Sequence, residues 1–205
     1  SSDLVILVVD VGGGTTDLSL MAVLERDGEL ALQRIAVGEH ILLGGDNMDL
    51  ALAYGVARKL AAEGRQLDAW QTRALAHACR AAKEALLSDA SLASAAVVVP
   101  SRGSKLIGGS VRSEVTRAEL TQILLDGFFP EVAVSDKPLV RARAALTQLG
   151  LPYAQDAAVT RHLAAFLSRQ AGATETIDGL QGTQPAGAGF LHPTAVLFNG
   201  GVLKA

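Results

Sequence analysis

The chain has 205 residues, enough to bury a core and to form one domain or two small ones. Hydrophobic residues make up 49% of it and charged residues 19%, which is typical of a globular protein and excludes a disordered one. A net charge of -3 without a basic stripe argues against nucleic acid as the main partner, and the apolar runs are too short to cross a bilayer, so no membrane partner is expected.

The cysteine and histidine residues indicate neither a disulfide framework nor a metal centre. Cys79 is the single cysteine, which favours a reducing, cytoplasmic location, and it lies on the apolar stripe of a predicted helix as a packed thiol. The histidines lack metal-ligand spacing and are interpreted as structural or exposed. Because the chain enters a strand pattern at once and stops soon after Gly201, we interpret it as a fragment of a longer protein.

Residues 1–45 predict three antiparallel strands followed by a glycine pair. The run at 4–10 is apolar and rich in β-branched residues, as in a central strand, and further strand patterns follow at 18–24 and 29–37. Arg26-Asp27-Gly28 joins the last two as a turn signal, with glycine where a positive φ can be needed. Together these runs predict a meander.

Residues 46–130 change to helical spacing and then to a short hairpin. Asp46 or Asn47 is suited to cap the first helix. Thr116 and Glu119 have the spacing of a capping box, which predicts another helix start. The expected elements are a helix starting after residue 45, a helix at 70–87, strands at 95–99 and 110–115 around a turn at 101–104, and a helix from 117 to about 128 that ends before Pro130.

Residues 131–205 predict further helices and one last strand. The glycine-rich segment at 172–189 is interpreted as a mobile loop. Residues 1–45 and 131–205 are therefore expected to build one α/β unit, with 46–130 as an inserted subdomain. The expected elements of this last part are helices at 139–149 and 157–170 and a short buried strand at 194–198.

The turn between the first two strands has more glycine and carboxylate than a hairpin needs. Glycines let the backbone approach a ligand closely, and successive N–H groups can form a concavity for phosphate oxygens. Two aspartates across the turn can hold hydrated Mg²⁺ or orient a water. A plain glycine-rich β-turn is the alternative, since the pattern is neither of the two better-known phosphate loops. The residues concerned are Asp10, Gly12, Gly13, Gly14, Thr15 and Asp17.

Two further glycine pairs stand at the ends of predicted elements. Gly44-Gly45 precedes a helix start, where backbone N–H groups and the helix dipole favour anions. Gly200-Gly201 follows the last predicted strand. Three glycine turns at strand ends predict a shared cleft that takes a phosphorylated ligand.

Four short segments, DVGGGTTDLS at 10–19, LGGDNMD at 43–49, ACRAAK at 78–83 and FNGGVLK at 198–204, carry a family resemblance. In the same order they resemble the DxGGGTxDxS phosphate loop, the LGGxxxD segment, the ACExAK helix and the VGGSTR adenosine turn of the seventy-kilodalton heat-shock chaperones (DnaK-type). The first motif is the most specific. The resemblance implies an α/β actin-like ATPase (ribonuclease H-like) fold, specifically lobe II of the nucleotide-binding domain, with 46–130 as its inserted upper α+β subdomain.

The resemblance also implies ATP or ADP with Mg²⁺ as the ligands. Gly13, Gly14 and Thr15 would hold the terminal phosphates. Asp10 and Asp17 would organise Mg²⁺ through water and, together with Thr15, the attacking water. The other residues implied in cofactor binding are Gly12, Gly44, Gly45, Arg80, Lys83, Leu87, Gly200, Gly201, Val202 and Lys204.

The nucleoside half of this implied site departs from the family's pattern, whereas the phosphate half keeps it. Arg80 stands in place of a glutamate and Leu87 in place of a ribose-binding serine, while Lys83 matches. Lys204 replaces an arginine, and a lysine cannot reproduce planar stacking over adenine. The sequence therefore predicts an intact phosphate site and an altered adenosine face.

The resemblance implies an ATP-binding fragment of a chaperone whose parent hydrolyses ATP to drive protein folding cycles. The first lobe of the same chain would be its partner, with unfolded client proteins and co-chaperones as partners of the parent. The fragment alone is expected to be inactive. The alternatives are a nucleotide-gated regulatory module without significant turnover, a filament protein or sugar kinase of the same fold, and an α/β domain without a ligand.

Overall fold

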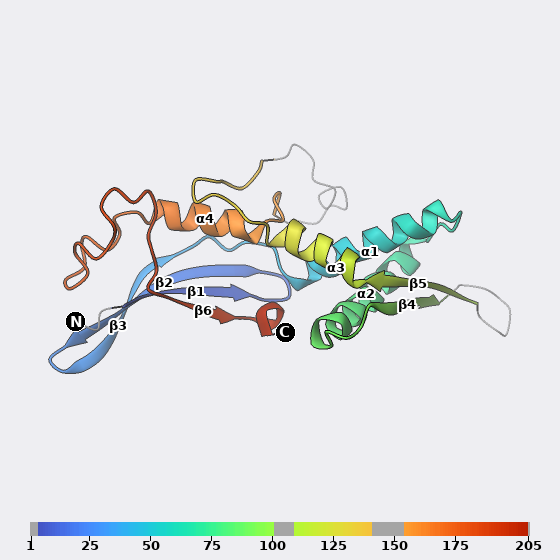
Figure 1. Cartoon of the computed structure of the whole chain (residues 1–205), viewed down its shortest axis with the longest axis horizontal. Coiled ribbons are helices and arrows are strands. Elements are labelled where there is room, and N and C mark those ends of the chain that lie inside the picture. Colours follow the sequence, from blue (N-terminus) through green and yellow to red (C-terminus); the bar gives the residue numbers. More distant parts are fainter. Residues whose placement is uncertain (1–3, 101–108, 141–153, 205) are drawn as a thin grey trace. The chain divides into compact units, whose positions relative to one another are not determined.

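The computed structural model describes residues 4–100, 109–140 and 154–204, and the chain forms two compact units (Figure 1). The first unit contains Ser1–Gly45 and Phe129–Lys204, and the second contains Asp46–Phe128. Of the predicted elements, the turn at 101–104 and most of the helix at 139–149 fall outside the described residues, and Leu139 and Val140 are not helical.

The first unit is built on a four-stranded sheet. Its strands are β1 (Leu4–Val11), β2 (Thr16–Arg26), β3 (Glu29–Val37) and β6 (Ala195–Asn199), in the order β3-β2-β1-β6. The predicted meander is confirmed, because β1 pairs with β2 and β2 with β3 antiparallel, while β6 joins β1 in parallel. The turn between β2 and β3 has positive φ at both Asp27 and Gly28, as a tight hairpin requires.

One face of this sheet forms the core of the unit. Buried and more exposed side chains alternate along β1 and β2, so Val9 and Leu18 are buried together with every second residue of their strands. Helix α4 (Val159–Arg169), which confirms the helix predicted at 157–170, packs on this face through Phe166. The residues between α4 and β6 form turns without a helix or strand, as predicted for a loop, but Ile177 and Leu180 are buried in the core.

Strand β6 corrects the prediction of a buried last strand. All five of its residues are exposed, including the apolar Leu197 and Phe198. The reason is its position, because β6 is an edge strand that hydrogen-bonds only to β1 among the described strands. An apolar run therefore predicted the strand correctly and its burial wrongly.

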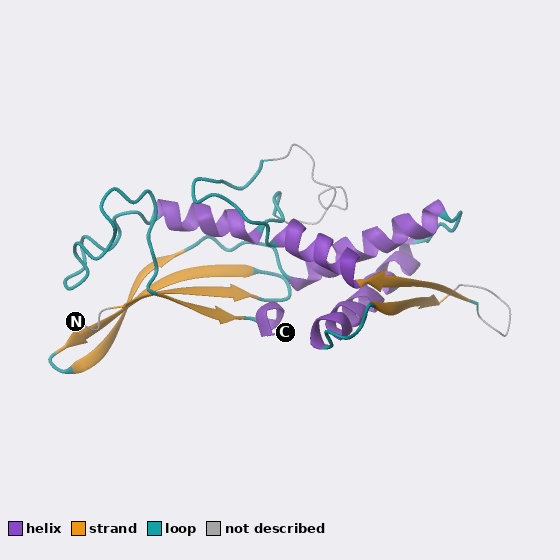
Figure 2. Ribbon diagram, in the orientation of Figure 1, coloured by secondary structure: helices purple, strands orange, loops and turns teal. Residues whose placement is uncertain are grey.

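The second unit is an α+β arrangement, seen in Figure 2 as helices beside a two-stranded ribbon. The elements of this unit are α1 (Gly45–Ala62), α2 (Ala69–Ser88), β4 (Ser94–Pro100), β5 (Ser110–Thr116), α3 (Arg117–Thr121) and the π-helical η1 (Gln122–Asp126). Helix α2 packs on β4 and β5, and its predicted apolar stripe of Leu75, Cys79, Ala82 and Leu86 is buried. Burial raises the pKa of the Cys79 thiol to about 12, as expected for an inert core thiol.

The helix starts of this unit are partly as predicted. The capping box of Thr116 and Glu119 is confirmed at α3, with the Thr116 side chain accepting from the Glu119 N–H. The first helix, however, begins at Gly45, so neither Asp46 nor Asn47 is its cap. Asp46 instead lies in the first turn, where its negative charge interacts favourably with the positive end of the helix dipole. Among the described helices, none is long and apolar enough to span a membrane.

Asp156 stabilises the segment that leads into α4 by accepting hydrogen bonds, and the neutral variant Asp156→Asn tests this role. Burial alone would raise the pKa of Asp156, but the N–H groups of Leu139 and Ala158 and the guanidinium of Arg161 outweigh it and lower the pKa. An Asp156→Asn substitution should cost about 2 kcal/mol of unfolding free energy at pH 7, because these donors lose a charged acceptor.

The sign of the pKa shift makes this loss depend on pH. Because the pKa of Asp156 is lower in the folded state, its charge stabilises the fold fully at pH values above the unfolded-state pKa of about 3.9, and this stabilisation is lost as the pH falls through the folded-state pKa. The difference in unfolding free energy between wild type and Asp156→Asn, measured in urea, should therefore become smaller as the pH falls below about 3.9. Glu131→Gln on the exposed surface is the matched control, and an equal loss in both variants would contradict this account.

Candidate functional site

The strand register places Asp10 and Asp17 directly opposite each other. Asp10 is the β1 residue whose Cα partner on β2 is Asp17. Directly paired residues of antiparallel strands project from the same face, and this is the face opposite the buried one that carries Val9 and Leu18. Like charges opposite each other repel, so the pair favours a cation or hydrogen-bond donors around it.

Each of the two carboxylates has donors from outside its own strand. Asn199 at the end of β6 donates its side-chain N–H to Asp10 Oδ2 at 2.9 Å. Thr15 donates its hydroxyl to Asp17 Oδ2 at 3.3 Å, and His40 Nδ1 lies 2.7 Å from Asp17 Oδ1. Sequence reasoning missed Asn199 and His40 as parts of this site.

The glycine loop between β1 and β2 is closed by backbone hydrogen bonds. Gly12 N–H donates to Thr15 C=O at 2.8 Å, and Gly45 N–H donates to Gly12 C=O at 3.0 Å. Thr16 at the start of β2 is fully buried, and its hydroxyl donates to Leu43 C=O at 2.8 Å. The loop is therefore fixed by hydrogen bonds to Leu43 and Gly45, which belong to the same unit.

Two of the predicted glycines are required by close packing of backbone against backbone. A Cβ on Gly44 would lie 2.5 Å from the Gly12 carbonyl oxygen and 2.7 Å from that of Gly13. Gly200 has φ of +88°, and a Cβ there would collide with the Val11 carbonyl group. These contacts join the Gly44 turn to the loop that follows β1, and the Gly200 turn to the last residue of β1 itself.

Other predicted glycines have no such structural requirement. A Cβ on Gly14 or on Gly201 would meet no atom within 4 Å, and neither residue has a positive φ. Gly14 is exposed at the tip of the loop, while Gly201 begins the short helix η3 (Gly201–Lys204). The open space at these positions is what close approach of a ligand would use.

The remaining predicted residues of η3 lie in the same unit. Val202 approaches Gly45, since a Cβ on Gly45 would be 3.2 Å from Val202 Cγ2. Lys204 is the last residue of η3. Thus all predicted phosphate-side residues, together with Val202 and Lys204, belong to the first unit, whereas Arg80, Lys83 and Leu87 belong to the second.

In the second unit, the predicted nucleoside-binding cations form ion pairs with α1. Arg80 Nε lies 2.7 Å from Asp49 Oδ2 and also pairs with Asp46. Lys83 Nζ lies 2.6 Å from Asp49 Oδ1, and only 10% of the Lys83 side chain is exposed. The hydrogen bond to Asp49 raises the pKa of Arg80. Both predicted cations are therefore paired with carboxylates of α1, and the third predicted residue of α2, Leu87, is exposed.

A magnesium ion fits the phosphate side of the first unit. Mg²⁺ keeps several waters and is commonly bound by one or two carboxylates together with substrate phosphates. The opposed Asp10 and Asp17 supply such a pair, and Gly14 leaves space beside them in the loop. Within the described residues there is no cluster of three or more His, Cys, Asp or Glu side chains for a metal held by protein ligands alone.

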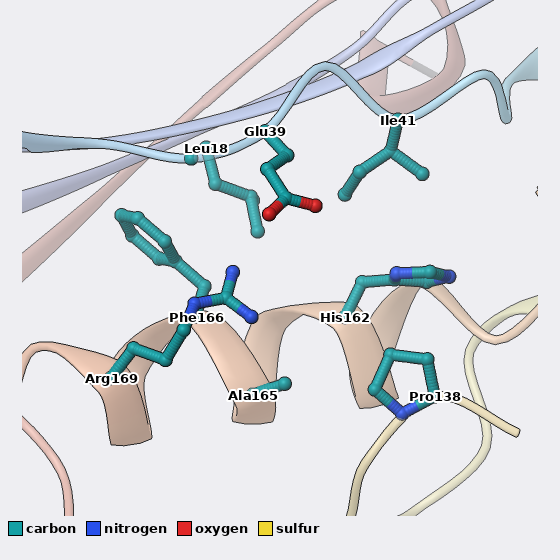
Figure 3. A pocket seen from close by; sticks show the side chains of 9 residues that line it. Leu18, Glu39, Ile41, Pro138, His162, Ala165, Phe166 and Arg169 are labelled. Atoms are coloured by element: carbon teal, nitrogen blue, oxygen red, sulfur yellow. The ribbon is translucent and has the colours of Figure 1, made fainter.

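A separate pocket of about 200 Å³ lies on the other face of the sheet, between it and α4 (Figure 3). Leu18 and Phe166 line it, and Glu39 and Arg169 extend into the same opening. Its position on the Leu18 face separates it from Asp10 and Asp17, so it is no part of the candidate phosphate site.

A comparison with known protein families matches the model described as Hsp70 protein to residues 1–144. The match includes the glycine loop with both aspartates, the Gly44-Gly45 turn and α2. Hsp70 proteins are chaperones whose ATPase domain has an actin-like fold and binds ATP or ADP with Mg²⁺, and the mixed α/β architecture of the chain agrees with this fold. The match covers more than half of the chain, which therefore belongs to the Hsp70 family.

Proposed function

We propose that the chain is the second lobe of the nucleotide-binding domain of an Hsp70-type chaperone that binds and hydrolyses ATP. The first unit would be the core subdomain that holds the phosphates, and the second unit the inserted upper subdomain. The first lobe of the same protein would complete the site, and unfolded clients and co-chaperones would be partners of the whole protein.

The single observation that carries this proposal is the pairing of Asp10 with Asp17 at the mouth of the glycine loop. A structural turn gains nothing from two opposed carboxylates, because like charges directly opposite are destabilising. Beside them, Gly14 is a glycine that neither backbone packing nor a positive φ requires. Both features are explained if a magnesium-bound polyphosphate lies against the loop.

The chain's own residues would act by position and charge. The N–H groups of Gly13, Gly14 and Thr15 would hold phosphate oxygens, as in other backbone anion sites. Asp10, held by Asn199, and Asp17 would orient waters, one of which attacks the terminal phosphate. Bound Mg²⁺ would supply neutralisation of the phosphate charge. In this proposal no covalent intermediate forms on the protein.

Alanine variants of two glycines separate ligand binding from folding. Gly14→Ala should leave the free energy of unfolding unchanged, because its methyl group meets no protein atom within 4 Å. It should weaken ATP binding at least about tenfold, because the methyl group enters the space proposed for phosphate. Gly44→Ala should cost about 1–3 kcal/mol of stability, because its methyl group overlaps the Gly12 carbonyl.

These glycine variants are checked by calorimetric ATP titration and urea unfolding of the full-length protein. Unchanged ATP affinity in a folded Gly14→Ala protein would contradict the placement of phosphates at this loop. A fully stable Gly44→Ala protein would contradict the close packing of the two turns.

Turnover of ATP by the full-length protein tests the catalytic part of the proposal. Asp10→Asn should lower the turnover rate at least about a hundredfold, because the Asp10 carboxylate is proposed to orient the attacking water. Nucleotide should still bind, because the glycine loop is proposed to hold the phosphates. The isolated chain should turn over little ATP, since groups from the first lobe would be missing. Asp178→Asn, in the loop between α4 and β6, is the control. Steady turnover by the isolated chain, lost on Asp10→Asn, would refute the requirement for the first lobe.

The ion pairs on α2 favour a second candidate, a nucleotide-gated regulatory module without significant turnover. Arg80 and Lys83 are engaged by Asp46 and Asp49, so both cations expected to meet the nucleoside are already paired with carboxylates of the chain itself. Loss of nucleoside contacts would weaken the binding energy that orients the phosphates for reaction. Binding of ATP by the full-length wild-type protein without measurable turnover would support this candidate over the ATPase.

A further inference from the structure

We propose that His40 is a positioning residue that fixes the Asp17 carboxylate for its role at the phosphate site. The proposal rests on the function proposed above and adds to it a residue that lies outside the four sequence motifs. It is carried by the 2.7 Å contact between His40 Nδ1 and Asp17 Oδ1 and by the backbone that delivers His40 to that place.

His40 and Thr15 together engage both oxygens of the Asp17 side chain. His40 contacts Oδ1, and the Thr15 hydroxyl donates to Oδ2 at 3.3 Å. The His40 contact is in the short range of hydrogen bonds to a charged acceptor. A carboxylate held at both oxygens keeps one orientation, even though the opposed Asp10 repels it.

The position of His40 is determined by the backbone on both sides of it. Two residues before it, Gly38 N–H donates to the Leu18 carbonyl at 2.8 Å. One residue after it, Ile41 exchanges hydrogen bonds with Thr16, of 2.9 Å and 3.2 Å. Leu18 and Thr16 are the two neighbours of Asp17 in β2, so this segment is fixed beside Asp17 itself.

Stability gives no sufficient reason for this contact. The side chains of His40 and Asp17 are 62% and 51% exposed, and ion pairs at such exposure contribute little to folding. The contact therefore matters through the geometry that it gives Asp17. If the imidazole is neutral, donation from Nδ1 requires the Nδ1–H tautomer and leaves Nε2 as an acceptor.

The first test compares His40→Ala with His40→Asn in the full-length protein. His40→Ala should lower ATP turnover about tenfold, as loss of an orienting partner does at other sites, with nucleotide affinity changed less than about twofold. His40→Asn should recover most of the turnover, because its amide N–H can donate near the position of Nδ1. His192→Ala is the matched control, an exposed histidine on the loop before β6.

The second test needs neither nucleotide nor activity. Nitrogen-15 NMR of the full-length protein with labelled histidine should show neutral His40 as the Nδ1–H tautomer, whereas free histidine favours Nε2–H. Asp17→Ala should return His40 to the Nε2–H tautomer, because the acceptor for Nδ1–H is gone.

The outcomes separate the two levels of the proposal. Wild-type turnover that is unaffected by His40→Ala, or an Nε2–H tautomer in the wild-type protein, would overturn the role of His40 and leave the proposed ATPase standing. A wild-type protein without turnover would overturn the ATPase and, with it, this role. Recovery in His40→Asn together with the Nδ1–H tautomer supports the role.

Discussion

The antiparallel register between β1 and β2 is the constraint on which the candidate site depends. It is set by burial, because one face of both strands carries the apolar residues that pack against α4 and the rest of the core. A slip of one residue in either strand would expose that strand's apolar side chains and turn its aspartate toward the core, so the register is strongly specified. The same hydrophobic packing that stabilises the sheet therefore brings two carboxylates together on its other face.

The loop that connects these strands is shaped before any ligand arrives. Gly44 approaches the loop, and Gly200 the end of β1, so closely that neither glycine tolerates a side chain, and Gly45 adds a hydrogen bond to Gly12. The proposed role of the Gly13, Gly14 and Thr15 N–H groups depends on such a fixed loop, because electrostatic stabilisation of a transferring phosphoryl group requires donors that are already in place. Contacts made on folding therefore fix the loop in a shape that leaves the space around Gly14 open.

Local patterns in the sequence were sufficient to predict the meander, the capping box of α3 and the buried stripe of α2. They failed where the determining contact joins distant parts of the chain. His40 and Asn199 reach the two aspartates from 23 and 189 residues away, and no periodicity records such a contact. The exposed β6 and the ion pairs of Arg80 likewise follow from which element lies beside which, not from their own residues.

The most direct test of the central claim is the magnesium dependence of ATP binding to the full-length protein, measured by calorimetry with and without the Asp10→Asn change. If the opposed carboxylates and the glycine loop form a site for magnesium-bound nucleotide, Mg²⁺ should strengthen ATP binding in the wild type. The strengthening should be smaller in Asp10→Asn. If ATP binds equally with and without Mg²⁺, or does not bind, the pairing of Asp10 with Asp17 has a different cause and the proposed function is wrong.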